Sequence, residues 1–163
     1  MDKIIEIYTD GSASKNGMAG SNGSFGVIVM RDGLVIDAYG SSRENDTTNN
    51  RQEMLAILWA YEHYGVEPSF GVSIPVVYSD SSYAINSFTK WSKSWKSNGW
   101  IKSDGKQPEN LDLIKNFDKL KMSGKEIDLI YVKGHAESFG NNLADRLATQ
   151  QITAEEILNK YGG

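Results

Sequence analysis

Cysteine is absent from this chain of 163 residues, which excludes disulfide bonds and any metal site built on thiolates. No apolar run approaches the length needed to cross a membrane, and the first residues lack the apolar stretch of a signal peptide. An excess of positive charge is also missing: the formal net charge is −4, unlike that of proteins that coat nucleic acid non-specifically. We therefore expect a soluble cytoplasmic protein.

The composition is that of an ordinary globular protein, with 39% hydrophobic and 23% charged residues. The length suits a single domain over residues 1–163, and with no obvious interface we expect a monomer. The charge is unevenly distributed, however. Residues 90–106 hold five lysines against one aspartate, a local net charge of +4, so the rest of the chain must carry −8. We call residues 90–107 the Trp/Lys segment.

Hydrophobic patterning divides the chain into alternating element types. Short β-branched and aromatic runs bounded by turn residues predict strands at residues 4–12, 24–30, 34–40, 74–79 and 126–132. Helical spacing and capping residues predict helices at residues 50–64, 81–89, 111–122, 140–152 and 154–161. The longest of these helices is expected to start near Asn49 or Asn50, and residues 41–49 are expected to form a loop.

The order of these elements predicts the fold class. The turn at residues 31–33 joins two strands in a hairpin, so the first three strands should form an antiparallel meander. Strands that then alternate with helices predict a mixed, five-stranded α/β sheet whose later strands are parallel, with helices on both faces. The run from Met54 to Tyr61 is apolar throughout, so its helix should be covered on most sides.

Asp10 and Asp80 each end a predicted strand. Asp10 could simply be a turn residue before Gly11, and Asp80 could simply cap the next helix. Ligands of open α/β sheets nevertheless gather at the carboxyl ends of strands, and adjacent strands would bring the two carboxylates together.

Glu53 and Asp145 lie in the first turns of predicted helices. A negative charge there could serve only to stabilise the helix dipole. Glu53, however, heads an apolar stripe formed by Ala56, Ile57 and Ala60, where a buried carboxylate is costly unless a cation or a hydrogen-bond donor meets it.

The four carboxylates are informative together. Hard oxygen ligands without soft ones favour Mg²⁺ or Mn²⁺ over Zn²⁺. Two such ions can activate a water and stabilise the leaving oxygen of a phosphodiester. The sequence therefore predicts a two-metal site at Asp10, Glu53, Asp80 and Asp145.

Two further features could serve a nucleic-acid substrate. His135 lies in a small loop after the last predicted strand, where it could be an idle surface residue or a proton shuttle beside the metals. Trp91, Trp95 and Trp100 are interleaved with lysines. They could pack on the body of the protein, hold a phosphate backbone, or do both.

Four short segments, in order, resemble type 1 ribonuclease H. They are Thr9-Asp10-Gly11-Ser12; residues 47–53 (TTNNRQE); Ser79-Asp80-Ser81; and residues 132–136 (VKGHA) with Asn141 and residues 145–148 (DRLA). The resemblance runs from residue 4 to about residue 150, and the joint occurrence of the segments is far more specific than any one of them.

The resemblance implies an endonuclease that cuts the RNA strand of RNA–DNA hybrids and leaves 5′-phosphate and 3′-hydroxyl ends. It implies that Asp10, Glu53, Asp80 and Asp145 hold the metals and that His135 is a catalytic histidine. It places Asn16, Asn49 and Asn50 at the hybrid near the cut and Thr48 at a DNA phosphate. It implies that a basic protrusion holds the DNA strand through Trp91, Trp95, Lys96 and Trp100.

The chain departs from the bacterial pattern at several positions. Lys96 is followed by Ser97 and Asn98 where a basic run is usual, Ser82 stands where a glutamine is common, and Glu137 replaces a glycine in the histidine loop. Two alternatives remain: a DNA-directed nuclease of the same fold, and a hybrid-binding module without catalysis.

Overall fold

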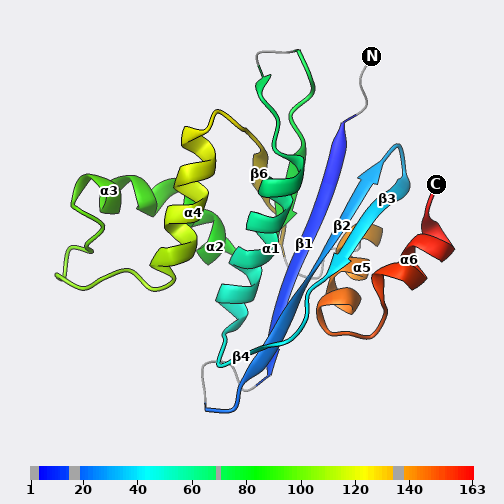
Figure 1. Ribbon diagram of the computed structural model, residues 1–163, viewed down its shortest axis with the longest axis horizontal. Helices are drawn as coiled ribbons and strands as arrows, with labels where there is room; N and C mark the ends of the chain where they lie inside the picture. The colour runs from blue at the N-terminus through cyan, green and yellow to red at the C-terminus, as the bar shows by residue number, and fades with distance from the viewer. Residues whose placement is uncertain (1–3, 15–18, 69–70, 134–137) are drawn as a thin grey trace.

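The structure, a computed structural model, describes residues 4–14, 19–68, 71–133 and 138–163. Within these residues a six-stranded mixed sheet forms the centre of the molecule, with its main strands in the spatial order β3-β2-β1-β5-β6 (Figure 1). The strands are β1 (Ile5–Ser14), β2 (Asn22–Arg31), β3 (Leu34–Gly40), β4 (Glu44–Asn45), β5 (Val76–Ser79) and β6 (Asp128–Tyr131). The first three are antiparallel, and β5 and β6 run parallel to β1, as predicted.

The helices are α1 (Asn49–Tyr64), α2 (Ser82–Asn86), α3 (Ser92–Ser97), α4 (Leu111–Met122), α5 (Phe139–Ala148) and α6 (Ala154–Tyr161). One face of the sheet packs on α1 through a core that includes Ile7, Val27 and Ala60. The opposite face packs on α5 and α6 through Ile28, Leu143 and Ile157, among others. The predicted α/β fold with helices on both faces is therefore confirmed.

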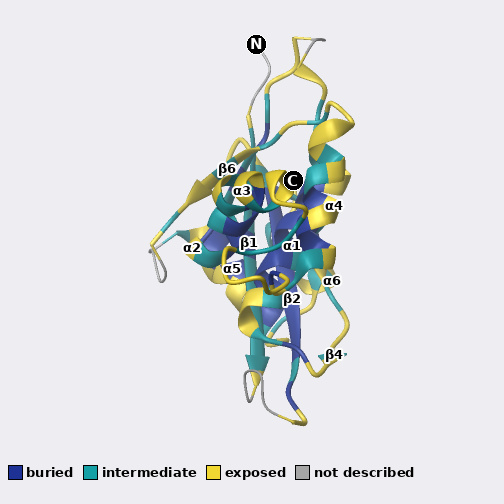
Figure 2. Cartoon of the chain, turned by 90° about the vertical axis from the view of Figure 1, so that its left-hand side faces the viewer, coloured by how far each residue is buried: buried dark blue, intermediate teal, exposed yellow. Residues whose placement is uncertain are grey.

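The central helix α1 is covered on two sides, as its apolar sequence predicts. It lies on the sheet, and its other side packs against α4 and the segment around Phe88. Buried residues concentrate where α1, β1 and β2 meet, whereas α3 and the outer side of α4 are exposed (Figure 2).

The expected start of α1 near Asn49 is confirmed, with Thr48 as the N-cap: it has extended backbone angles and its hydroxyl accepts from Arg51 N. Other predicted boundaries were wrong. Helix α5 ends at Ala148 rather than 152, and Gln150 has a positive φ of 61°. Residues 41–49 are not wholly a loop, because Glu44–Asn45 pairs with Asn22–Gly23 and adds a sixth strand to the five predicted. Strand β4 is only two residues long, too short to show the alternating hydrophobic pattern from which a strand could be inferred.

The predicted helix at residues 81–89 is part of a longer, interrupted one. Ser81 caps α2, which continues through a π-helical turn, Ser87–Trp91, into α3. The hydroxyls of Thr89 and Ser92 donate to carbonyls four residues back, a bond that often bends helices. This path carries α3, the start of the Trp/Lys segment, to the side of the molecule away from β2 and β3 (Figure 1). No helix among the described residues is long and apolar enough to span a membrane.

Candidate active site

Asp10 and Asp80 are brought together by parallel strand pairing. Tyr8 of β1 pairs with Tyr78 of β5, so the two aspartates follow at the same offset on neighbouring strands. The sequence placed Asp10 at a strand end, which was wrong: β1 continues to Ser14 because it stays paired with β2. Asp10 instead lies at the level where β5 has ended, beside Asp80.

Glu53 lies one turn into α1, and its carboxylate reaches the same site as those of Asp10 and Asp80. Its Oε1 accepts a hydrogen bond of 2.9 Å from Gly11 N. The close approach requires the glycine, because a Cβ at position 11 would lie 2.3 Å from Glu53 N and 2.4 Å from Gln52 C. Gly11 therefore allows β1 and α1 to approach closely. The turn-like sequence Asp10-Gly11 does not reveal this role.

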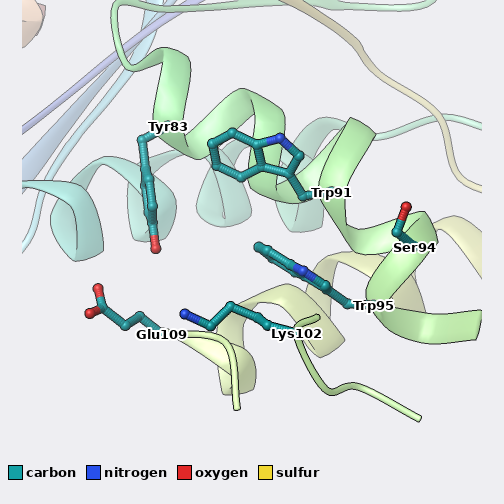
Figure 3. Close-up of a pocket in the computed structure, with 6 residues that line it drawn as sticks. All are labelled: Tyr83, Trp91, Ser94, Trp95, Lys102 and Glu109. Atoms are coloured by element: carbon teal, nitrogen blue, oxygen red, sulfur yellow. The ribbon is translucent and has the colours of Figure 1, made fainter. Parts of the chain in front are cut away.

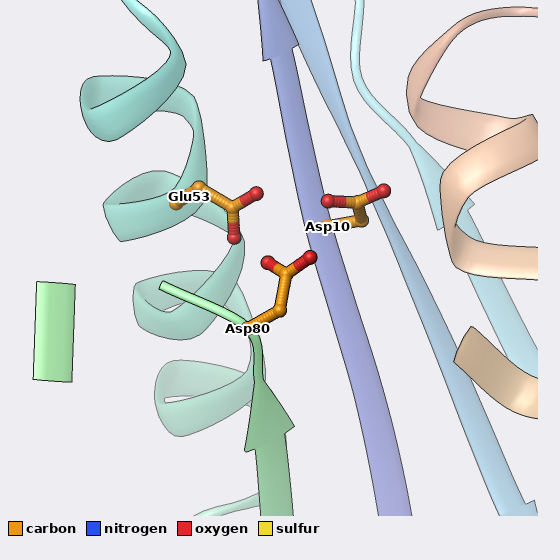
Figure 4. A group of neighbouring side chains, drawn as sticks. All are labelled: Asp10, Glu53 and Asp80. Atoms are coloured by element: carbon orange, nitrogen blue, oxygen red, sulfur yellow. The ribbon is translucent and has the colours of Figure 1, made fainter. Parts of the chain in front are cut away.

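Asp10, Glu53 and Asp80 each offer an oxygen within 4.8 Å of the others (Figure 4). Glu53 is only 6% exposed, and its Oε2 is buried without a hydrogen-bond partner. Burial raises the pKa of Glu53 well above its ordinary value, and the neighbouring Asp10 and Asp80 raise it further. Burial is also the largest influence on Asp10, whose pKa rises to about 7.

Asp145 lies beside this group on α5, the helix on the opposite face of the sheet from α1. It lies close enough to Asp10 to raise the pKa of that carboxyl group further. Asp145 itself is exposed. The structure thus clusters Asp10, Glu53 and Asp80 and places Asp145 near Asp10.

The donor set fits a hard divalent cation. Its members are carboxylate oxygens, and the unpartnered Oε2 of Glu53 lies where a cation would remove the cost of burying it. Without a positive charge, three carboxylates this close repel one another. Any of Asp10, Glu53, Asp80 and Asp145 could therefore serve as a ligand.

The N-terminus of α1 presents the next group of predicted residues. Thr48 caps the helix, and Asn49 Oδ1 accepts from Ala13 N at 2.6 Å, which ties the helix to the end of β1. Asn50 follows and is exposed. The predicted residues Asn16 and His135 lie outside the described residues.

The Trp/Lys segment divides into two faces. Trp91 and Trp95 lie with their ring centroids 6.0 Å apart and, with Tyr83, Ser94, Lys102 and Glu109, line a pocket of about 450 Å³ (Figure 3). Lys96 does not line this pocket, and its Nζ lies 2.8 Å from Asp118 Oδ2 on α4. Trp100 packs against the core below α4, with Lys115 Nζ 5.7 Å from its ring centroid.

Sequence reasoning missed some residues that the structure places at these sites. Tyr83 precedes Trp91 by eight residues and Trp95 by twelve, a helical spacing that could have suggested a shared face. Lys102 and Glu109 carried no such signal, since they reach the pocket from the loop before α4. Arg51 was also missed. It joins α1 to β4 and α4 through Glu44, Asn110 and Asp112.

Comparisons with known proteins agree on one family. The family model described as RNase H matches residues 2–153. A ribonuclease H of Thermoanaerobacter sp. (strain X514) is 38% identical over 150 residues, which is 91% of this chain and 90% of the relative. A ribonuclease H of Methylobacillus flagellatus is 34% identical over 158 residues, covering 95% and 97% of the two chains.

Solved structures resemble the fold. The crystal structure of LC9-RNase H1, a type 1 RNase H with the type 2 active-site motif, has a TM-score of 0.71 at 25% identity and covers 96% of this chain and 74% of that one. The solution structure of the PFV RNase H domain has a TM-score of 0.70 at 24% identity, covering 92% and 94%.

Proposed function

The chain belongs to the ribonuclease H family, and we propose that it hydrolyses the RNA strand of RNA–DNA hybrids at the cluster formed by Asp10, Glu53, Asp80 and Asp145. Ribonuclease H is a metal-dependent endoribonuclease, and the products would carry 5′-phosphate and 3′-hydroxyl ends. The observation that carries the assignment of the site is the cluster itself. In a chain of this family, three carboxylates approach within 4.8 Å around a buried oxygen that has no partner.

The four carboxylates would hold two divalent metal ions, and Mg²⁺ is our proposal because the donors are hard oxygens; Mn²⁺ would also fit. When bound, such ions activate a water and neutralise the leaving oxygen of a phosphodiester. The protein supplies the positioning. Parallel pairing fixes Asp10 relative to Asp80, and the hydrogen bond from Gly11 N fixes Glu53.

The substrate would lie across the N-terminus of α1. Only the 2′-hydroxyl distinguishes RNA from DNA at a given position, and asparagine amides can both donate to it and accept from it. We assign this contact to Asn16, Asn49 and Asn50, and a DNA phosphate contact to Thr48. His135 would carry a proton during product departure, since an imidazole titrates near neutral pH.

The DNA strand would extend to the Trp/Lys segment. Trp91 and Trp95 offer aromatic surface for sugars or bases, and the lysines offer positive charge for phosphates. Trp100 and Lys96 belong to the same proposal as residues of the protrusion. Both make contacts with α4, which would stiffen the protrusion.

The experiment that tests the function compares four end-labelled substrates of one sequence: RNA–DNA, RNA–RNA, DNA–DNA and single-stranded RNA. Each is incubated with Mg²⁺ and with a chelator. We expect cleavage of only the RNA strand of the hybrid and only with metal. Cutting of duplex DNA would assign the fold to a DNA-directed nuclease, and tight hybrid binding without cutting would indicate a binding module.

A matched variant tests the site. Asp10→Asn keeps the shape of the side chain but removes a ligand charge, so cleavage should fall to background while hybrid binding persists. Glu62→Gln, which removes an exposed acid from α1, serves as the control. Near-normal turnover in Asp10→Asn would exclude the metal assignment.

Three statements about the whole chain remain predictions. They are a single domain over residues 1–163 with a protrusion at about 90–107, a cytoplasmic location without membrane association, and a monomeric state. Size-exclusion chromatography with light scattering would test the last.

A further inference from the structure

The aromatic pocket on the Trp/Lys segment contains one basic and one acidic side chain. Lys102 and Glu109 both line the space beside Tyr83, Trp91 and Trp95. Figure 3 shows the Lys102 ammonium on the same side of the pocket as the Glu109 side chain and the Tyr83 hydroxyl. The pocket therefore offers apolar surface at its centre and opposite charges at one side.

Lys102 is held in place by its own loop. Its backbone N donates to Lys106 O at 2.8 Å, and its carbonyl accepts from Gly105 N at 2.9 Å. Its ammonium lies 3.9 Å from Asp104 Oδ2, beyond the range of a hydrogen bond. The lysine is thus anchored at the backbone, and its loose ion pair with Asp104 can give way to a phosphate.

Lys96 differs from Lys102 in its ion pair and in the hollow that it lines. Its ammonium forms a 2.8 Å ion pair with Asp118, and it lines a different hollow together with Lys93 and Lys121. A phosphate that approached Trp91 and Trp95 would therefore meet Lys102, whereas Lys96 points to the other side of α3.

We propose that Lys102 and Glu109 set how strongly this chain holds the DNA strand, Lys102 by neutralising a phosphate beside Trp91 and Trp95 and Glu109 by opposing it. This inference rests on the proposed function. Aromatic faces bind sugars and bases without regard to sequence, and an ammonium at their edge adds the phosphate contact. A carboxylate on the same side repels that phosphate, so the pocket binds DNA less tightly than its lysine alone would.

The test measures hybrid binding by fluorescence anisotropy with the full chain in chelator, which prevents cleavage. Neutralising a lysine that contacts a phosphate should weaken binding about 3- to 10-fold and reduce the salt slope of log Kd by roughly 0.7–0.9 between about 50 and 200 mM salt. We expect this of Lys102→Gln, with substantial recovery in Lys102→Arg. Glu109→Gln should tighten binding about 2- to 5-fold.

Matched controls remove the same charge elsewhere. Lys93→Gln lies on the same short helix but lines the other hollow, and Glu62→Gln removes an exposed acid from α1. Lys93→Gln should weaken binding clearly less than Lys102→Gln, because Lys93 lines the other hollow. Glu62→Gln should change Kd by less than about 1.5-fold, because exposed charges beyond a Debye length are screened.

Equal effects of Lys102→Gln and Lys93→Gln would overturn the proposal, as would a loss confined to Lys96→Gln. Weaker binding in Glu109→Gln would show that the carboxylate orients Lys102 rather than opposing the phosphate, and would overturn the role given to Glu109. Cleavage of the hybrid with Mg²⁺, measured in parallel for the unmodified chain, separates these outcomes from a failure of the proposed function. In that assay the variants should change KM and leave kcat unaltered.

Discussion

Gly11 N donates a 2.9 Å hydrogen bond to Glu53 Oε1, and this contact joins the central strand to the central helix at the candidate metal site. The strand and the helix can approach this closely because residue 11 has no side chain. A Cβ there would lie 2.3 Å from Glu53 N.

Gly11→Ala should therefore impair both stability and activity. The added methyl group would push α1 away from β1, at a cost of about 1–3 kcal/mol in the free energy of unfolding. It would also displace Glu53, so hybrid cleavage should fall by about 100-fold or more, as when reacting groups are misplaced by an ångström. Urea denaturation and initial cleavage rates measure the two effects.

Gly33→Ala is the control for this substitution. A Cβ at Gly33 meets nothing within 4 Å, although its φ of 79° makes alanine somewhat strained. This variant should lose about 1–2 kcal/mol through backbone strain and keep its activity. If Gly11→Ala behaves in the same way, the close approach is not required.

The carboxylate cluster should destabilise the metal-free protein. Asp10, Glu53 and Asp80 repel one another, and Oε2 of Glu53 is buried without a partner. In chelator, Asp10→Asn should raise the melting temperature by about 2–4 °C, which corresponds to about 1 kcal/mol for a chain of this size. Mg²⁺ should raise the melting temperature of the unmodified chain, because it binds only the folded state, and should have less effect on the variant.

Differential scanning calorimetry with and without Mg²⁺ tests this prediction. Glu62→Gln removes a carboxylate from the exposed side of α1 and should show neither effect. A lower melting temperature for Asp10→Asn in chelator would contradict the proposed repulsion.

The ion pair between Arg51 and Asp112 predicts a pH dependence of stability. Arg51 approaches both carboxylate oxygens, at 3.1 and 2.8 Å, and its hydrogen bonds lower the pKa of Asp112 below the ordinary 3.8. A carboxyl group with a lowered pKa in the folded state contributes stability above its unfolded pKa and loses it as pH falls through the folded value. Because Asp112 is largely exposed, the contribution at pH 7 should be about 0.5–1 kcal/mol.

The free energies of unfolding of the unmodified chain and of Asp112→Asn should therefore differ at pH 7 and converge below about pH 3. Urea titrations at several pH values measure the difference. Glu62→Gln, on the exposed side of α1, should give no such difference at any pH. A constant difference for Asp112→Asn across the range would mean that the pair with Arg51 is not its source.

Asn49 has a structural and a proposed substrate role that substitutions can separate. Its Oδ1 accepts from Ala13 N, so Asn49→Asp keeps the acceptor whereas Asn49→Ala removes it. The alanine variant should therefore lose about 1 kcal/mol of stability. Both should weaken binding to the RNA–DNA hybrid relative to a DNA duplex, by about 10-fold, because both lose the amide donor proposed to contact a 2′-hydroxyl.

Thermal unfolding and anisotropy titrations with the two duplexes make this comparison. Hybrid binding by Asn49→Asp as tight as that of the unmodified chain would remove the donor role. A loss of stability in both variants would show that the hydrogen bond from Ala13 needs the amide.

Elements with strong local signals were predicted to the residue. Helix α6 begins after a capping box formed by Thr153 and Glu156, and α4 shows clear helical periodicity over residues 111–122. Strand β3 lies at residues 34–40, between a tight turn and a glycine. In each case residues close together in the chain determine where the element begins and ends, so its bounds can be predicted from the sequence.

Elements that depend on distant partners were predicted less well. Strand β1 is longer than expected because Ala13 and Ser14 also pair with residues of β2, and β4 exists only through its pairing with Asn22 and Gly23. The helix predicted at residues 81–89 continues into α3 through a π-helical turn that no sequence pattern predicted.

The sequence by itself determined the fold class and selected the four carboxylates that we propose hold the metal, because hydrophobic period, turn residues and the family segments are local properties of the chain. Only the tertiary structure decided that Asp10 and Asp80 share a register, that Glu53 reaches them past a glycine, and that Lys102 rather than Lys96 lies beside the tryptophans. These relationships arise from strand pairing and helix packing between residues far apart in the chain, which local patterns do not encode.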